Sequence, residues 1–412
     1  MDMKPDPRPS GPVESYLRCL HRDIAALSDG EVADYIPELA KSDPEDFAIA
    51  IASVDGALYT VGCADKAFTI QSASKPFMFA YAIETCGIDA VMQKVGVEPT
   101  GDSFNSIVLD EVNNRPFNPM VNAGAIAMSE QVRGATLEAR EAEQIGFFSR
   151  IAGRDLGMDH AVYLSERETG HRNRAIAHMM LNNGMISSKP DDVLDIYFRQ
   201  CSILVTAEDL AIMGATLAAH GLNPITGKRV LSPTTVRDVL SVMATCGMYN
   251  YAGQWMFDVG LPAKSGVSGG ILAVLPGQFG IAVYSPRLDD VGNSVRGIEV
   301  CKRLSRDFGL HAYVDRTDTR NVVRRSYGGA RVRSNRVRTP RDLDTLAEVG
   351  GSIAVVEAQG PLYFGSAERL IREIAALPAD PTVIIIDLRR ITYADNAAIT
   401  LLRHAVQSMA TG

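Results

Sequence analysis

The sequence predicts an α/β protein of two domains: a large domain with a sheet and helices packed around it, and a small α/β domain. Three observations lead to this prediction. The chain has 412 residues, which is too long for one ordinary domain. Strand patterns stand near both ends of residues 1–310, with a long helical stretch between them. A short β-α-β-α order then fills residues 346–412, after an arginine-rich segment.

The first domain, residues 1–310, begins with a helix from Leu17 to Leu27 and a hairpin that turns at Asp55-Gly56. A helix is expected from about Ser72 through Ile83, and asparagine-rich loops that include Asn122 follow it. We expect the N- and C-terminal strands to be neighbours in one sheet. The later elements are helices within 137–180, 190–198 and 207–220, and strands over 271–275 and 279–284.

Residues 311–345 are predicted to be a linker. Nine arginines and a single acid, Asp318, lie between Arg316 and Arg341, and large apolar residues are few. Such a segment could contact RNA or an acidic surface. A solvated linker is the favoured interpretation, because only Tyr327 is interleaved with the arginines and one ring is no stacking platform.

The second domain, residues 346–412, is predicted to be a small unit of the parallel type. A strand at 353–356 is followed by a turn at Gly360-Pro361 and a helix over 366–377. A fully buried strand at 383–386 and a second helix over 395–406 complete the pattern. No further covering element follows, so we expect this domain to be incomplete.

Composition narrows the possible functions. The net charge of -8 argues against a general nucleic-acid or membrane-surface binder. The N-terminus has no apolar run typical of a secretory signal. The uncharged stretch 265–286 is predicted to form two strands around a Pro-Gly-Gln turn and not a membrane-spanning helix. We therefore expect a cytoplasmic protein. The six cysteines are far apart and the seven histidines form no triad or metal pair. We therefore expect no cofactor and no metal.

The sharpest local motif is Ser72-Ala73-Ser74-Lys75, at the start of an expected helix. This spacing puts the serine and the lysine on one helix face. A neutral lysine can take the serine proton, and burial or a second nearby cation lowers the lysine pKa enough for that role. The serine N–H, at a helix N-terminus, can form half of an oxyanion hole. Alone, the motif also arises by chance on exposed helices.

A second element is Lys264-Ser265-Gly266, which opens the uncharged strand region. An early S-x-x-K and a late K-[ST]-G are the arrangement of serine β-lactamases and penicillin-binding proteins. There the second motif edges the active site and can place a second cation beside the first lysine. Lys264 alone could be a surface lysine at a strand end, but the two motifs together favour a serine acyl-transfer enzyme.

A longer series of segments resembles the serine-dependent glutaminases, both the bacterial enzymes and the animal kidney- and liver-type enzymes. The matches occur in family order over about residues 15–310. This family shares the β-lactamase-like fold, an antiparallel sheet with helices around it, which accounts for the two motifs and for the order of elements. The matching segments are 35–40, 71–76, 118–126, 165–168, 172–173, 197–198 with 201–202, 246–249 and 262–270.

The resemblance implies hydrolysis of L-glutamine to L-glutamate and ammonia through a glutamyl-serine intermediate. Ser72 would be the nucleophile and Lys75 its base, and Tyr249 would assist the proton transfers, including the one to the leaving ammonia. The backbone N–H groups of Ser72 and Val267 would form the oxyanion hole. The implied substrate contacts are Tyr35, Ser72, Asn122, Glu166, Asn173, Tyr197, Tyr249 and Val267.

These residue types suit a free amino acid. Glu166 can pair with the α-ammonium group, while asparagine and tyrosine donors can hold the carboxylate and the side-chain amide. Each residue also has a plain structural explanation: Asn122 could shape a turn, Glu166 could pair with Arg167 or Arg172 on a helix surface, and the tyrosines could belong to the core. The resemblance favours the functional explanation.

The C-terminal piece resembles a STAS domain, the fold of anti-sigma-factor antagonists and of sulfate-transporter tails. The matching segments are 360–364, 383–389 and 393–398. Antagonists carry a phosphorylatable serine just after the position of Asp395, where this chain has Asn396. Asp395 is therefore expected only to cap the following helix. The implied organisation is a glutaminase with a truncated STAS module whose partner is unknown.

Two other functions are compatible with some of these features. A penicillin-recognising hydrolase or transpeptidase would share Ser72, Lys75 and Lys264, but it would need export. A non-enzymatic STAS regulator would have a degenerate first domain, and the intact Ser72, Lys75, Glu166 and Tyr249 argue against that. The family resemblance further implies a homo-oligomer, a dimer or a tetramer.

Overall fold

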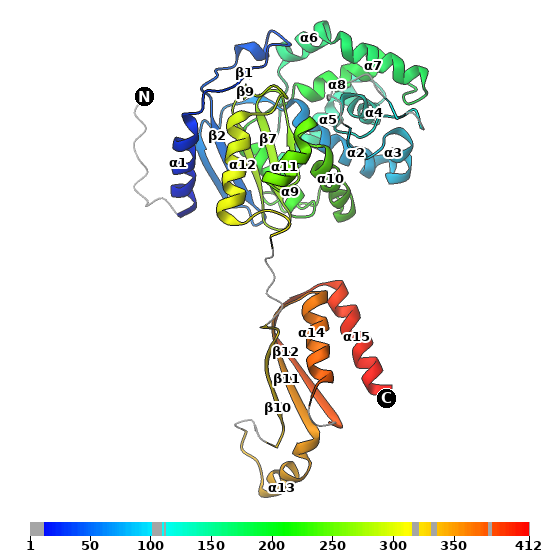
Figure 1. Ribbon diagram of the computed structural model, residues 1–412. Helices are drawn as coiled ribbons and strands as arrows, with labels where there is room; N and C mark the ends of the chain where they lie inside the picture. The colour runs from blue at the N-terminus through cyan, green and yellow to red at the C-terminus, as the bar shows by residue number, and fades with distance from the viewer. Residues whose placement is uncertain are drawn as a thin grey trace. The chain divides into compact units, whose positions relative to one another are not determined.

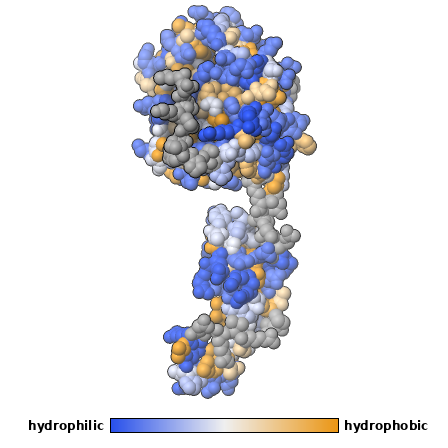
Figure 2. Space-filling view, turned by 90° about the vertical axis from the view of Figure 1, so that its left-hand side faces the viewer, coloured by the Kyte–Doolittle hydropathy of each residue, from blue (hydrophilic) through white to orange (hydrophobic). Residues whose placement is uncertain are grey.

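A computed structural model describes residues 12–100, 109–110, 113–314, 321–330, 336–377 and 381–411. The chain folds into two compact units, Met1–Val314 and Asp315–Gly412. Figure 2 shows that one face of the first unit is mostly hydrophilic, with smaller hydrophobic areas. The described helices include none that is both long and apolar enough to cross a bilayer.

A five-stranded antiparallel sheet forms the centre of the first unit, with strand order β3-β2-β8-β7-β6. Strand β2 (Ala48–Ser53) pairs with β8 (Phe279–Tyr284), so strands from the two ends of the unit are neighbours, as predicted. The expected hairpin at Asp55-Gly56 joins β2 to β3, and Gly56 has a φ of 92°. The other strands are β3 (Leu58–Gly62), β6 (Ala263–Ser265), β7 (Gly270–Leu275), and the short pairs β1 (Glu31–Val32) with β9 (Arg287–Leu288) and β4 (Phe68–Thr69) with β5 (Leu204–Val205).

Both faces of this sheet are covered by helices. Alternate side chains of each strand point to opposite faces, and each set packs into its own hydrophobic cluster. Ile49, Ile281 and Val283 belong to the hydrophobic cluster that includes α1 and α12. Ala50 and Ala282 belong to the cluster on the other side, which includes α9. Figure 1 shows α1 and α12 in front of the sheet and most other helices to one side of it.

The helices of the first unit are more numerous than the sequence predicted. Helix α4 begins at Asn122, where a loop was expected, and every residue from Asn122 to Ser129 is buried. A helix without an exposed face has no amphipathic period, which explains why the pattern missed it. The helices are α1 (Pro12–Ala25), α2 (Lys75–Cys86), α3 (Ile88–Lys94), α4 (Asn122–Glu130), α5 (Leu137–Ala152), α6 (His160–Thr169), α7 (His171–Asn182), α8 (Pro190–Cys201), α9 (Ala207–Ala218), α10 (Pro233–Cys246), α11 (Ala252–Asp258) and α12 (Val295–Phe308), with the 3₁₀ turns η1 (Leu39–Lys41), η2 (Gln71–Ser74) and η3 (Tyr249–Tyr251).

The second unit contains a three-stranded sheet of order β10-β11-β12. Strand β11 runs parallel to β12, as the predicted β-α-β pattern requires, and β10 is antiparallel to β11. The Asp395 carboxylate accepts the Ala398 N–H at 2.7 Å and so caps the last helix, as predicted. The elements are β10 (Val323–Gly328), α13 (Pro340–Val349), η5 (Gly350–Ser352), β11 (Ile353–Leu362), α14 (Phe364–Ala375), β12 (Val383–Ala394) and α15 (Asn396–Thr411).

Three details of this unit differ from the sequence predictions. The segment 311–345, expected as a linker, contains β10 and the start of α13, while its residues 315–320 and 331–335 lie outside the described chain. Gly360-Pro361 is not a turn, because β11 continues through Leu362 with a shifted register. Strand 383–386 is not fully buried: Val383 and Ile385 are each 48% exposed. The hydrophobic cluster with α14 and α15 covers only one face of this sheet.

Candidate active site

The turn η2 places Ser72 directly before α2, so that the nucleophile candidate and Lys75 stand at the start of one helix. Ser72 is 6% exposed and Lys75 is 1% exposed. Pro76 fits the first helical turn, where its missing N–H costs little. Gln71, directly before Ser72, has a φ of 47°, a conformation that non-glycine residues rarely adopt. Such strain is typical of functional turns.

Lys75 is the first link of a buried hydrogen-bonded chain. Its Nζ donates to Oδ1 of Asn122 at 2.7 Å, and Nδ2 of Asn122 donates to Oδ1 of Asn173 at 2.9 Å. Burial lowers the pKa of Lys75 to about 8, although the nearby Cys201 and Glu166 oppose the shift. About a tenth of Lys75 is therefore neutral at pH 7 and able to accept a proton.

Tyr249 reaches Ser72 from the 3₁₀ turn η3. Its hydroxyl donates to the Ser265 carbonyl at 3.0 Å and also shares a hydrogen bond with the Ser72 side chain. Burial raises the pKa of Tyr249, so its proton is present at neutral pH. Its φ of 53° makes it the second left-handed non-glycine residue at this site.

The Lys264-Ser265-Gly266 segment forms β6 and its end, and it passes close to the η2 turn. A Cβ atom on Gly266 would lie 3.0 Å from the Ile70 carbonyl and 3.6 Å from the Ser72 amide nitrogen. Glycine therefore permits this close approach. Lys264 is fully buried, and its Nζ donates to the Ser265 carbonyl at 2.6 Å. Burial, and then the charge of Lys75, lowers the pKa of Lys264 well below its usual range.

A pocket of about 220 Å³ opens beside Ser72. Glu166 lies in it and is 4% exposed, and burial raises the pKa of its carboxyl against hydrogen bonds from Tyr35 and Gln71. The Tyr35 hydroxyl donates to Glu166 at 2.9 Å, although the residue as a whole is 51% exposed at the mouth. The lining residues are Tyr35, Ile36, Gln71, Ser72, Asn122, Glu166, Thr169, Gly170, Arg172, Asn173, Tyr197, Cys201 and Val267.

The structure brings all the residues named from the sequence to this one place. Most of them line the pocket, while Lys75 and Tyr249 stand behind it, bonded to Asn122 and to Ser72. Glu166 is no surface acid, and Asn122 starts a helix instead of shaping a turn.

Six lining residues were not predicted as site residues, although the sequence carries a signal for two of them, Gln71 and Cys201; the other four are Ile36, Thr169, Gly170 and Arg172. Gln71 directly precedes Ser72, and Cys201 lies one helical turn after Tyr197 on α8. The Oε1 of Gln71 accepts the Tyr35 hydroxyl at 3.2 Å, so Gln71 belongs to the network around Glu166.

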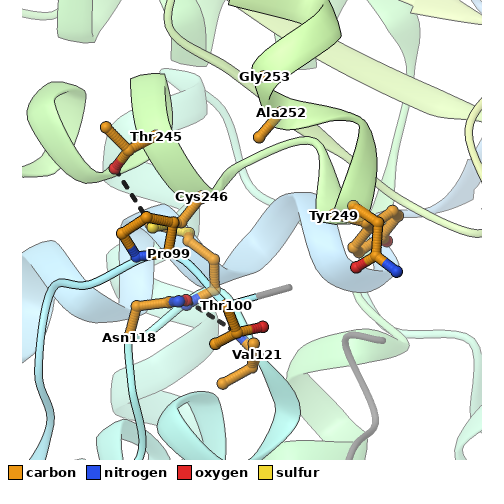
Figure 3. Close-up of a pocket in the computed structure, with 11 residues that line it drawn as sticks. Pro99, Thr100, Asn118, Val121, Thr245, Cys246, Tyr249, Ala252 and Gly253 are labelled. Atoms are coloured by element: carbon orange, nitrogen blue, oxygen red, sulfur yellow. Dashed lines mark hydrogen bonds between the residues drawn. The ribbon is translucent and has the colours of Figure 1, made fainter. Parts of the chain in front are cut away.

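A second, smaller pocket of about 150 Å³ borders the Tyr249 turn (Figure 3). Its lining includes Cys246, Tyr249, Ala252 and Gly253 on one side, and Asn118 and Val121 on the other. Tyr249 thus stands between Ser72 and a hollow. Within the described part of the chain, His, Cys, Asp and Glu side chains form no group of three that could hold a metal ion.

A buried serine and lysine at the start of a helix, facing a K-S-G strand at the edge of an antiparallel sheet, define the class of β-lactamase-like serine proteins. Within that class, the chain belongs to the glutaminase family, whose profile matches residues 30–313. The profile of the STAS domain matches residues 345–411.

Curated relatives and solved structures agree with this assignment. Glutaminase 2 of Bradyrhizobium diazoefficiens is 46% identical over 403 residues, which cover 97% of this chain and 64% of that protein. This chain thus spans about two thirds of the length of that relative. The glutaminase of Trichormus variabilis is 53% identical over 306 residues, or 74% of this chain and 91% of the relative. A crystal structure of Mglu in its glutamate form superposes with a TM-score of 0.81 at 36% identity, covering 98% and 97% of the two chains.

Proposed function

We propose that this chain hydrolyses L-glutamine to L-glutamate and ammonia, through an ester between the γ-carboxyl group of the substrate and Ser72. The observation that carries the proposal is the contact of Ser72 with Tyr249, close to a buried Lys75 whose pKa is lowered to about 8. Family membership supports the same reaction.

In the first half-reaction, Lys75 takes the Ser72 proton while Oγ attacks the side-chain carbonyl carbon of glutamine. The negative oxygen that forms is stabilised by the N–H groups of Ser72 and Val267, which the close approach at Gly266 supports. Tyr249 gives a proton to the leaving nitrogen as the C–N bond breaks, and ammonia departs. Tyr249 then regains its proton from the protonated Lys75, so both groups are ready for the second half-reaction.

In the second half-reaction, water attacks the glutamyl ester and Lys75 accepts the water proton. The bond to Ser72 Oγ breaks, glutamate leaves, and the proton returns to Ser72. One water is consumed and one ammonia and one glutamate are released, so the cycle balances. No cofactor takes part in this scheme.

The charges of the pocket support a free amino acid as the substrate. Glu166, held by Tyr35 and Gln71, offers a carboxylate to the α-ammonium group. Asn173 and Tyr197, with Asn122 behind them, offer neutral donors and acceptors to the carboxylate and amide. We further propose a cytoplasmic homo-oligomer, and a STAS domain that binds a regulatory partner.

The experiment that tests the covalent step is rapid acid quenching of the protein during turnover of L-glutamine, followed by peptide mass spectrometry. A glutamyl adduct on the peptide with Ser72, absent from Ser72→Ala, is the expected result. Turnover without any adduct on this serine would contradict the mechanism. Labelling of Ser72 by a fluorescent penicillin would favour the penicillin-recognising alternative instead. Absence of glutamine turnover in folded protein would favour the regulator.

A further inference from the structure

We propose that Lys264 is a positioning residue for Tyr249: it fixes the tyrosine hydroxyl against Ser72 through the Ser265 carbonyl and the tyrosine ring. The inference rests on the proposed function, because Tyr249 must act in proton transfer for its position to matter. Lys264 does not line the pocket, and its described contacts are with Ser265 and Tyr249.

One carbonyl oxygen joins Lys264 to Tyr249. The Ser265 carbonyl accepts Nζ of Lys264 at 2.6 Å and the Tyr249 hydroxyl at 3.0 Å. A carbonyl has two lone pairs, so it can accept both donors together. The same Nζ lies 4.1 Å from the centre of the Tyr249 ring. Lys264 therefore contacts Tyr249 over its ring and holds the acceptor of its hydroxyl.

Tyr249 is buried, at 8% exposure, but its turn borders a hollow on one side. The turn η3 borders the second pocket, and Tyr249, Ala252 and Gly253 all line that hollow (Figure 3). The left-handed backbone at Tyr249, with its φ of 53°, also requires support from its surroundings. One backbone hydrogen bond lies nearby: the Ser265 N–H donates to the Gly247 carbonyl at 3.3 Å.

The cost of burying Lys264 supports a specific role. The side chain is fully buried, and the ion pairs of the described residues give it no carboxylate partner. Burying an amine without a counter-ion is unfavourable, and an apolar residue would avoid that cost. The contacts that the amine does make are those to the Ser265 carbonyl and the Tyr249 ring.

A double-mutant cycle tests the inference with the full chain. Lys264→Met keeps the length of the side chain and removes the donor, and Tyr249→Phe removes the hydroxyl that Lys264 is proposed to position. We expect Lys264→Met to lower kcat for L-glutamine by about 10- to 100-fold, with KM within about 3-fold. In the Tyr249→Phe background, Lys264→Met should lower kcat by less than about 2-fold, because the two residues act as a unit.

Additive losses in the two backgrounds, or an unchanged kcat in Lys264→Met, would overturn the inference. The exposed Lys228→Met is the matched control and should leave kcat unchanged. Should Lys264→Met not fold, as judged by its thermal transition, Lys264→Gln goes through the same cycle with the same criteria. A wild-type protein without glutamine turnover would instead contradict the proposed function, so the two failures are distinguishable.

Discussion

The Nζ atom of Lys75 lies 2.7 Å from Oδ1 of Asn122, and both side chains are buried. Lys75 starts α2 and Asn122 starts α4, so the contact joins the first turns of two helices. The neutral acceptor holds the amine in place without adding a negative charge beside it. The pKa of Lys75 therefore stays at about 8, where an opposite charge would raise it.

The pH dependence of turnover follows from that pKa. Only neutral Lys75 can accept the Ser72 proton, so kcat/KM for L-glutamine should rise with pH, with a midpoint near 8. Below the midpoint, it should fall about tenfold for each pH unit. Initial rates between pH 5.5 and 9.5 check this expectation. A flat profile from neutral to acidic pH would rule out Lys75 as the base.

Asn122→Asp should move that midpoint upward. The new carboxylate would stand beside Lys75 and favour its ammonium form, raising the lysine pKa by about 1 to 3 units. The variant should therefore be least active, relative to wild type, at neutral and acidic pH. Asn182→Asp, an exposed change at the end of α7, is the control and should keep the wild-type profile. An unshifted midpoint in a folded Asn122→Asp would contradict the argument.

Glu166→Gln should weaken substrate binding. The change removes the negative charge that faces the α-ammonium group and keeps the shape of the side chain. Losing one partner of a buried, hydrogen-bonded charge pair costs about 2 kcal/mol or more, so kcat/KM should drop at least about 30-fold, mainly through KM. Steady-state kinetics on L-glutamine measure the effect. The exposed Glu168→Gln should behave as wild type, and equal KM values for the two variants would refute the role of Glu166.

Gly266→Ala should impair catalysis by moving β6 away from the nucleophile. Its Cβ would meet the Ile70 carbonyl at 3.0 Å and the Ala73 nitrogen at 3.3 Å, and both are backbone atoms. A misplacement of about 1 Å costs about 100-fold in rate, so a loss of up to that size in kcat is expected. Gly157→Ala, whose Cβ would meet no atom within 4 Å, is the matched control. Full activity of a folded Gly266→Ala would show that this approach is not needed.

The sequence was sufficient for the large sheet and for the positions of the site residues. Apolar runs mark β2, β7 and β8, because successive side chains there pack into hydrophobic clusters on both faces of the sheet. The S-x-x-K and K-[ST]-G motifs are local signals, and their chemistry requires them to meet in space. The structure adds what joins them: the Tyr249 hydroxyl, which bonds both to the Ser265 carbonyl and to Ser72.

Other features depend on packing that no local pattern encodes. Helix α4 is buried on all sides, so its composition lacks a polar face. Strand β10 lies within an arginine-rich stretch and pairs with β11, where Glu357 forms an ion pair with Arg324. The apolar run that starts β12 predicted a fully buried strand. In the structure, one face of its sheet lacks a covering helix among the described residues, so part of the run is exposed.

The measurement that tests the central claim most directly is release of glutamate and ammonia from L-glutamine, by wild type and by Ser72→Ala side by side. Both proteins are first shown to be folded by their thermal transitions. Equal amounts of the two products from wild type, and a rate at least about 1,000-fold lower for Ser72→Ala, are the predicted result. Comparable turnover by the two proteins would contradict the serine mechanism, and no turnover by wild type would contradict the proposed reaction itself.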